Sequence, residues 1–462
     1  MSTMDSTLQN STTNVPGGAV IDHPRQDSTE VSLTEKSSKN DRKWWRRVWH
    51  VSREDAADQP PPPPPPDGGI VAWTQVAMGH LVIFNTWGFV NSFGVFQPYY
   101  TGALHQPRST ISWIGSVQIF LLFAIGAYSG RALDAGRFRI VTFVGYVTHI
   151  LGIFLTSISS QYWHVLLTQG FLVGIGNGLL FCPTISLVGT YFSYWKSFAM
   201  GVAAAGSATG SLIYPVVVQK LLPEIGFGWT VRILGFITLF TSTLAFALLK
   251  PRLPPRPSGP MIDWAAFKEP AYDLYCLGTF LIFLGLYFAF YYIGAYARDI
   301  IGLSYTESIN LILIINGVGY VGRILPAIIA DKYIGALNAI IPCAFGSGVL
   351  LFGWVGVRDR GGQIAFAVVY GLFASGVQSM FAIALSSLTH DLGKIGTRNG
   401  MCFTIVSVAT LIGPPIAGIL IGEDDGNYLY AQAYGGSTVV AGSLVLIAAR
   451  FYVTGPKLIA RA

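Results

Sequence analysis

Residues 272–297 read YDLYCLGTFLIFLGLYFAFYYIGAYA, a run of apolar residues in which Asp273 is the single charged residue. About 20 apolar residues in a helix cross the hydrocarbon core of a bilayer. Runs of similar length, separated by short polar breaks, follow one another along the chain at 71–98, 111–130, 139–158, 163–188, 197–220, 230–249, 272–297, 306–329, 337–357, 364–388, 399–421 and 434–454. We therefore predict an all-α integral membrane protein with twelve transmembrane helices.

The charge content supports this prediction. Charged residues make up 11% of the 462-residue chain, against roughly 25% in soluble globular proteins. Residues 1–66 hold 17 of the 52 charges, leaving 35 for the other 396 residues. So few charges cannot cover the surface of a water-soluble fold, which excludes a soluble enzyme. We expect no cofactor, no metal site, and no nucleic-acid or nucleotide partner; the lipid bilayer is the surrounding medium.

The composition also divides the chain. We predict a disordered cytoplasmic tail at 1–66 that ends in polyproline, two six-helix bundles at 67–249 and 272–454 joined by a cytoplasmic linker at 250–271, and a cytoplasmic C-terminus at 455–462. Within the tail, residues 42–49 (RKWWRRVW) combine tryptophan with basic residues. This segment is either a membrane-surface anchor, a solvated linker or a partner-binding patch.

The distribution of basic residues predicts the orientation. With the tail inside, internal loops and the C-terminus carry 14 Lys and Arg and external loops carry six. Cytoplasmic loops of membrane proteins carry the excess of basic residues, so we expect both termini in the cytoplasm.

The two halves contain similar short motifs at equivalent positions. Gly130-Arg131 with Asp134 closes the second span, and Gly322-Arg323 with Asp331 closes the eighth. Duplication of a six-helix unit is typical of alternating-access transporters, in which the substrate binds between the repeats near the bilayer midplane.

Arg323 is the strongest candidate for a binding residue. It lies eight positions before Asp331, which places it about 12 Å along the helix. A cation at this depth is costly unless it is paired, solvated by a cavity or available to an anion. Arg323 is therefore either a site for an anionic substrate or a structural residue that extends towards the inner face.

Neutral polar and aromatic side chains within the spans supply the other candidates. The predicted substrate-binding residues besides Arg323 are Asn85, Asn91, Asn177, Tyr287, Tyr291, Asn316 and Gln378. Gln118 belongs to the same set of neutral polar side chains within the spans. Any one of them can instead form an interhelical hydrogen bond, but together they indicate a cavity for a larger, partly aromatic organic molecule. His80 and His149 are the titratable candidates for coupling to a co-transported proton.

Two segments resemble known signatures. Residues 66–73 (PDGGIVAW) and 191–210 (YFSYWKSFAMGVAAAGSATG) resemble those of the monocarboxylate-transporter family of the major facilitator superfamily, in its fungal branch. The resemblance implies two pseudo-symmetric six-helix bundles with a central site between spans 1, 4, 5, 7, 8 and 10. Small residues in the second segment allow a neighbouring helix to approach closely.

The resemblance also assigns roles to individual residues. Arg323 matches the arginine of span eight that family members use towards carboxylate substrates. Gly319 and Val95 stand where proton-coupled lactate carriers have an aspartate and a lysine, so proton coupling by that charge pair is not expected. Residues 130–137 (GRALDAGR) resemble the superfamily's loop between spans two and three. By this likeness Asp134, Arg137 and Asp331 form a conformational latch, although the loop is one residue short, and plain positive-inside charge is the alternative.

The predicted function is transport of a small organic molecule by alternating access, either secondary active or facilitative. Analogy with fungal relatives favours efflux of a secondary metabolite across the plasma membrane. Two alternatives remain open from the sequence: uptake of a monocarboxylate or riboflavin-like compound, and a non-transporting nutrient sensor.

Overall fold

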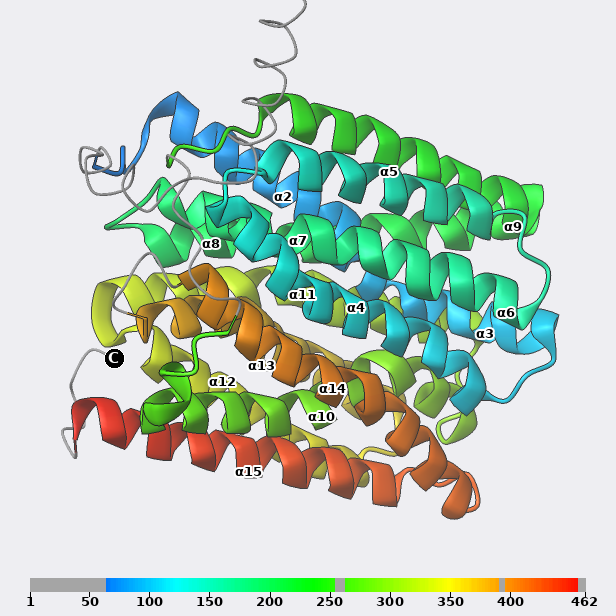
Figure 1. The fold of residues 1–462 in the computed structure, drawn as a ribbon. Helices are drawn as coiled ribbons and strands as arrows, with labels where there is room; N and C mark the ends of the chain where they lie inside the picture. The colour runs from blue at the N-terminus through cyan, green and yellow to red at the C-terminus, as the bar shows by residue number, and fades with distance from the viewer. Residues whose placement is uncertain (1–63, 254–261, 390–394, 456–462) are drawn as a thin grey trace, which may run out of the picture. The chain divides into compact units, whose positions relative to one another are not determined.

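The computed structural model describes residues 64–253, 262–389 and 395–455, and all regular elements in these residues are helices (Figure 1). The predicted tail with its 42–49 segment, part of the predicted linker, and the C-terminus beyond Gly455 lie outside the described residues.

The helices follow one another with short connections. In chain order they are α2 (Gly69–Asn91), α3 (Phe93–Leu104), α4 (Arg108–Asp134), α5 (Phe138–Thr156), α6 (Tyr162–Val165), η2 (Leu166–Leu172), α7 (Val173–Thr190), α8 (Lys196–Ala204), α9 (Gly206–Leu248), η3 (Ala266–Lys268), α10 (Pro270–Asp299), α11 (Tyr305–Ile329), η4 (Ala330–Ile334), α12 (Ala336–Gly353), η5 (Trp354–Gly356), α13 (Arg360–Ser387), α14 (Ile395–Glu423) and α15 (Leu429–Thr454).

Twelve membrane spans can be counted in the described residues. Ten helical segments are long and apolar enough to cross a bilayer. One of them, residues 196–248, contains two spans, and α2 with α3 supplies the twelfth. The predicted all-α, twelve-helix architecture is confirmed.

Helix α9 is a hairpin. Gly226 has φ 76° and ψ 170°, a conformation that reverses the chain and that residues with a side chain rarely adopt. On either side of it, the Tyr214 and Thr238 hydroxyls are hydrogen-bonded at 3.1 Å. In a straight helix, residues 24 positions apart would be separated by about 36 Å. The two arms of α9 are therefore the separate spans predicted at 197–220 and 230–249.

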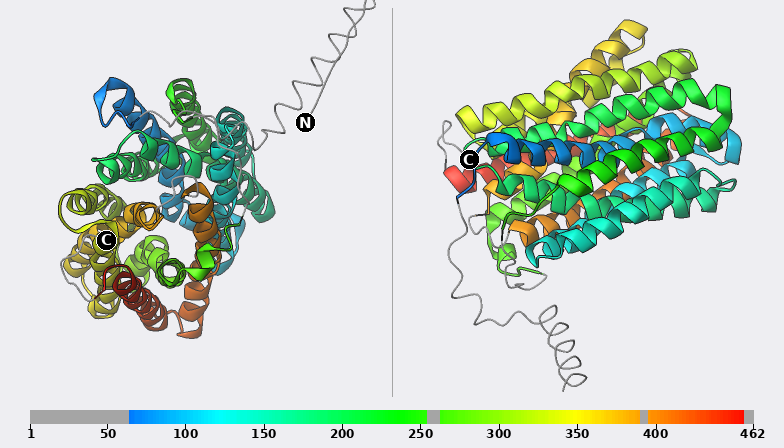
Figure 2. Two further views of the ribbon diagram at one scale, coloured as in Figure 1. Left: turned by 60° about the vertical axis from the view of Figure 1, so that its left-hand side comes forward. Right: turned by 90° about the horizontal axis from the view of Figure 1, so that it is seen from above.

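The packing repeats between the two halves of the chain. In the first half α4 packs on α7, and α5 packs on α7 and α9; in the second half α11 packs on α13, and α12 packs on α13 and α15. Seen nearly end-on, the helices coloured blue to green gather on one side and those coloured light green to red on the other (Figure 2). The equivalent pairs demonstrate the two-fold repeat, whereas the exact domain boundaries stay a prediction.

Contacts between the halves follow the same symmetry. Helix α4 packs along α14, and α11 packs against α8 and α9. We call the end of the bundle where α2 begins and α15 ends the termini face, and the opposite end the far face. The halves thus meet mainly where α14 packs on α4 and where α11 packs on α8 and α9, and their remaining inner faces are available to a central site.

Close backbone packing joins α2 to α9. A Cβ atom at Gly88 would lie 2.6 Å from the Cα of Gly210, and one at Gly206 would overlap the carbonyl oxygen of His80. The small residues of the 191–210 signature therefore bring span one and span five together within the first half.

Candidate functional site

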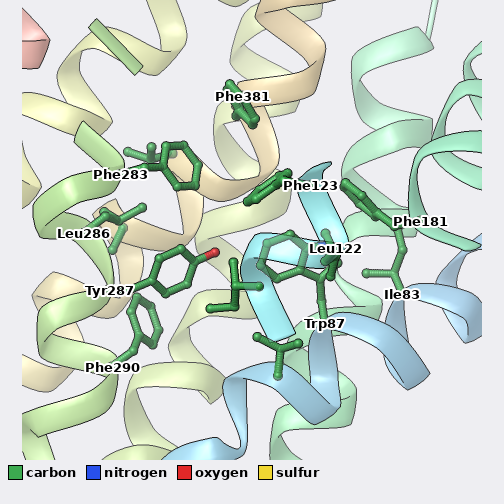
Figure 3. Close-up of a cluster of buried hydrophobic side chains, with 14 of the residues drawn as sticks. Ile83, Trp87, Leu122, Phe123, Phe181, Phe283, Leu286, Tyr287, Phe290 and Phe381 are labelled. Carbon is green, nitrogen blue, oxygen red and sulfur yellow. The ribbon is translucent and has the colours of Figure 1, made fainter. Parts of the chain in front are cut away.

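An aromatic cavity lies between the two halves. Trp87 of α2, Phe123 of α4 and Phe181 of α7 form its wall on one side, and Phe283 and Tyr287 of α10 line the other. Figure 3 shows these side chains converging, with the Tyr287 hydroxyl directed towards the side chains from α2 and α4. The Trp87 and Tyr287 rings are stacked, with centroids 6.4 Å apart at 11°. Each wall thus comes from a different half of the chain.

The cavity is small, and the two halves contact each other on either side of it. Its volume is about 30 Å³, which is enough for two or three water molecules. Towards the far face, the hydroxyls of Ser112 and Tyr292 are hydrogen-bonded at 3.1 Å across the halves. Towards the termini face, Asp331 contacts the start of α8.

Arg323 forms the polar part of the cavity. Its side chain is buried, with 1% of the residue exposed. Nη1 donates to the Gly319 carbonyl at 3.0 Å and to the Ser375 hydroxyl at 2.9 Å, and Nη2 donates to Gln378 Oε1 at 2.8 Å. These bonds use three of the five guanidinium N–H groups and fix the plane of the guanidinium.

The charge of Arg323 has no carboxylate beside it in the described part of the chain. The ion pairs that the structure records there join Arg360 to Glu307, and Arg398 to Asp263 and Glu269. A buried cation without an anionic partner is destabilising, and two remaining N–H donors can bind an anion. The site is therefore suited to a negatively charged group.

Three further polar atoms in the cavity lining are buried without a hydrogen-bond partner among the described residues. They are Trp87 Nε1, the Tyr287 hydroxyl and Gln378 Nε2. Buried polar groups in native proteins almost always have partners. These three atoms are therefore available to a ligand or to water, and they surround the same space as Arg323.

The structure places the predicted substrate-binding residues at different positions. Arg323, Tyr287 and Gln378 line the cavity. Asn85 does not, because it bonds to Ser242, Tyr214 and Thr241 in the packed seam between α2 and α9. The others lie one or two helical turns towards the far face: Asn91, Asn177, Tyr291 and Asn316.

Neither candidate histidine lines the cavity. His80 Nδ1 lies 2.9 Å from the Val202 carbonyl, and Nε2 lies 3.1 Å from the Thr209 hydroxyl. Because a carbonyl only accepts, Nδ1 carries a proton. His149 is fully buried, and its ring nitrogens have no hydrogen-bond partner among the described residues. A role in coupling remains a prediction for both.

Asp331 joins the two halves at the termini face. Its carboxylate accepts from the Phe198 amide at 2.8 Å and the Ser197 amide at 3.2 Å, at the N-terminus of α8. Lys332 also lies over the Trp195 ring at 5.7 Å. Amide groups at a helix N-terminus bind carboxylates favourably.

The other predicted latch residues lie in the loop between α4 and α5. Asp134 is the last residue of α4, and its side chain lies outside what the structure describes. The Arg137 amide donates to the Ala132 carbonyl at 2.9 Å. A latch role for Asp134 and Arg137 therefore stays a prediction.

The aromatic lining of the cavity was not predicted from the sequence. An aromatic residue in a buried helix has the same sequence pattern whether it packs in a core or lines a cavity. The sequence therefore did not distinguish the lining residues from other members of the apolar spans; they are Trp87, Phe123, Phe181, Phe283 and Phe381. A weak signal was available in the four-residue spacing of Phe283 and Tyr287, which puts both on one face of α10.

Two membrane-embedded bundles with repeated packing, and a cavity between them, are typical of an alternating-access membrane transporter. The profile of the Major Facilitator Superfamily matches residues 77–396, so the chain belongs to this superfamily of transporters. The prediction of a transporter in place of an enzyme is confirmed.

Fungal proteins are similar over most of this chain. An MFS-type transporter of Gibberella zeae is 43% identical over 385 residues, which cover 83% of this chain and 87% of the relative. The aspyridones efflux protein apdF of Emericella nidulans is 34% identical, over 83% of this chain and 78% of the relative. The crystal structure of the human organic anion transporter MFSD10 (TETRAN) has the same fold, with a TM-score of 0.63 at 14% identity, covering 86% of this chain and all of that chain.

Proposed function

We propose that this chain exports a small organic secondary metabolite that combines aromatic rings with an anionic group. The observation that carries the proposal is the cavity itself, in which a buried Arg323 without a carboxylate partner is surrounded by aromatic side chains from both halves. Aromatic walls bury flat apolar rings, while the guanidinium binds a carboxylate or a phenolate.

Efflux is the direction that the relatives favour. The aspyridones efflux protein is among the similar proteins, and its name gives both a direction and a class of cargo for that protein. We extend this direction of transport to this chain. We also propose that the chain belongs to the monocarboxylate porter family, lies in the plasma membrane and has both termini in the cytoplasm. On this orientation the termini face is cytoplasmic and the far face is external.

The proposed cargo is larger than a simple monocarboxylate. Gly319 and Val95 replace the charge pair of proton-coupled lactate carriers, and the Gly319 carbonyl instead accepts from Arg323. A Cβ at Gly319 would lie 2.6 Å from Arg323 Nη1 and overlap the Ser375 hydroxyl. An aspartate at this position would therefore displace the present arginine network, which supports a binding mode different from that of the lactate carriers.

The test compares metabolites inside and outside cells of a strain lacking the gene with those of the wild type. We expect an aromatic acid or phenol to accumulate inside the deletion strain and to be restored to the medium by the intact gene. The Arg323→Gln variant, with surface expression equal to the wild type, should fail to restore export. A matched control is Arg232→Gln, because Arg232 lies over the Trp229 ring at 4.8 Å and does not line the cavity. Restoration by Arg323→Gln would contradict the proposed role of the cavity.

A further inference from the structure

A second group of buried polar side chains lies between the central cavity and the far face. Its members come from five helices, and we call them the polar layer: Asn91, Gln118, Asn177, Tyr291 and Asn316. All five are almost completely buried. Both amide atoms of Asn91, Gln118 and Asn177, the Tyr291 hydroxyl and Asn316 Oδ1 have no hydrogen-bond partner among the described residues.

The helical register places these residues at a similar depth. Asn91 lies four residues after Trp87 on α2, Asn177 lies four before Phe181 on α7, and Tyr291 lies four after Tyr287 on α10. Four residues are about 6 Å along a helix and return to nearly the same face. Because α2 and α10 run towards the far face while α7 runs away from it, all three residues lie one turn beyond the cavity in the same direction.

Contacts between elements connect the layer across the two halves. The Phe93 and Tyr291 rings lie 5.3 Å apart, and a Cβ at Gly115 of α4 would lie 2.5 Å from the Tyr291 hydroxyl. Within the first half, a Cβ at Gly174 of α7 would lie 3.1 Å from the Cα of Gln118 of α4. The first half and α10 therefore meet at this level, as they do at the central cavity.

One member of the layer, Tyr291, also lines a second hollow nearer the far face. Tyr291 lines this hollow together with Gln97, Thr101 and Arg298, between α3 and α10. The volume of the hollow is about 150 Å³, several times the volume of the central cavity. Tyr287, one turn from Tyr291, lines the central cavity and stacks on Trp87.

We propose that the polar layer is a second binding station for the transported molecule, and that it takes neutral hydroxyl and carbonyl groups. Amides and a phenol donate and accept hydrogen bonds without charge, so the layer complements oxygen substituents on a ring, whereas Arg323 takes the anion. A molecule released from Arg323 moves one helical turn to the layer and then to the hollow at the far face. This inference rests on the proposed function, because it follows the same cargo along its exit path.

The thermal stability of variants distinguishes a binding role of the polar layer from a structural role, and the measurement needs no ligand. A buried polar group that lacks a partner destabilises the fold, so Asn91→Leu and Asn177→Leu should raise the unfolding temperature of the purified protein or leave it unchanged. The matched control is Asn85→Leu on the same helix, since Asn85 is equally buried but bonded to Ser242, Tyr214 and Thr241. That variant should lower the unfolding temperature. A decrease in the Asn91 and Asn177 variants equal to that of the control would overturn the proposal.

Transport of two probes then tests the chemistry. In proteoliposomes of the full chain we expect Asn91→Leu and Asn177→Leu to raise the KM for 3,5-dihydroxybenzoate about fivefold, the effect of one lost neutral hydrogen bond. The KM for benzoate, which has the same charge and no hydroxyl, should change less than twofold. Arg323→Gln should abolish transport of both probes. Equal changes for both probes in the asparagine variants would refute the second station while leaving the proposed function intact.

If the wild type carries neither probe, both of which are smaller than the proposed cargo, the accessibility of the layer to a water-soluble reagent tests the second station. If the cargo path runs through the layer, Asn91→Cys and Asn316→Cys should then react with a hydrophilic methanethiosulfonate reagent whenever the halves rock apart at the far face. The native cysteines are buried and give the background. Reaction of both variants no faster than this background would overturn the proposal.

Discussion

Removal of the Asp331 carboxylate should open the termini face. Asp331, at the end of the α11 segment, accepts two backbone hydrogen bonds from the start of α8 in the other half. A hydrogen bond to a charged group contributes about 1.5–3 kcal/mol, and exposure to solvent reduces the value. Because Asp331 is only half-buried, we assign about 2 kcal/mol to the pair of bonds. Asp331→Ala should therefore shift the equilibrium towards the open termini face by about 25-fold.

The shift can be measured with two spin labels on either side of this contact. Tyr194 and Tyr333 are 73% and 68% exposed, and both lie close in sequence to the contacting residues. Double electron–electron resonance on the Tyr194→Cys, Tyr333→Cys protein should show an increased population of the longer distance when Asp331→Ala is added. Asp331→Asn, which keeps one acceptor oxygen without the charge, should produce a smaller shift in the same direction.

Asp67 provides the matched control. It precedes α2, and its carboxylate accepts from the Ser193 and Tyr194 amides in the loop that leads to α8. This contact resembles that of Asp331 in chemistry but joins two segments of the same half. Asp67→Ala should lower the unfolding temperature and can broaden the distance distribution, because it frees the loop that carries the label at residue 194, but it should not add the longer distance. An unchanged distribution in Asp331→Ala, or an equal change in Asp67→Ala, would refute the assignment of Asp331 as the connection between halves.

Three further predictions test packing, charge and coupling. Gly206→Leu should destabilise the protein by at least about 1–3 kcal/mol, because its Cβ would overlap the His80 carbonyl; an unchanged unfolding temperature in detergent would contradict this close approach. Arg398→Ala should lower the free energy of unfolding by about 2 kcal/mol, because the hydrogen bonds of 2.6 and 2.8 Å from Arg398 to the half-exposed Glu269 would be lost. An unchanged unfolding temperature in detergent would contradict this prediction. His149→Phe should leave the pH profile of vesicle transport unchanged, because His149 does not line the cavity, and a flattened profile would assign it to coupling.

The architecture could be predicted because bilayer thickness constrains every span. Runs of about 20 apolar residues identify helices whatever their neighbours are, so most boundaries differ by only a few residues from those of the structure. Span one is the exception. The run at 71–98 is divided into α2 and α3 at Ser92, and α3 continues through Pro98 to Leu104. A polar residue in an apolar run does not reveal from sequence that the helix breaks beside it.

A residue of the candidate site could be predicted from the sequence only where its burial costs free energy. Arg323 stood out because a buried charge in a span requires a reason, and the structure places it in the cavity. Asn85 and Asn91 could not be distinguished, because both are asparagines near the middle of one helix. Only the packed structure shows that Asn85 faces hydroxyl groups from α9 while Asn91 has no partner among the described residues. Partner geometry depends on distant segments that local sequence does not specify.

The division of the cavity between the halves has a consequence for release. Arg323 and the side chains that hold it, Ser375 and Gln378, all belong to the second half. The facing wall of Trp87 and Phe181, from the first half, is apolar apart from the indole N–H. When the halves rock apart, the apolar wall moves away from the cargo while the anion remains on Arg323. Water then reaches the aromatic rings before it reaches the ion pair, so we expect the strength of the Arg323 contact to limit the rate of release.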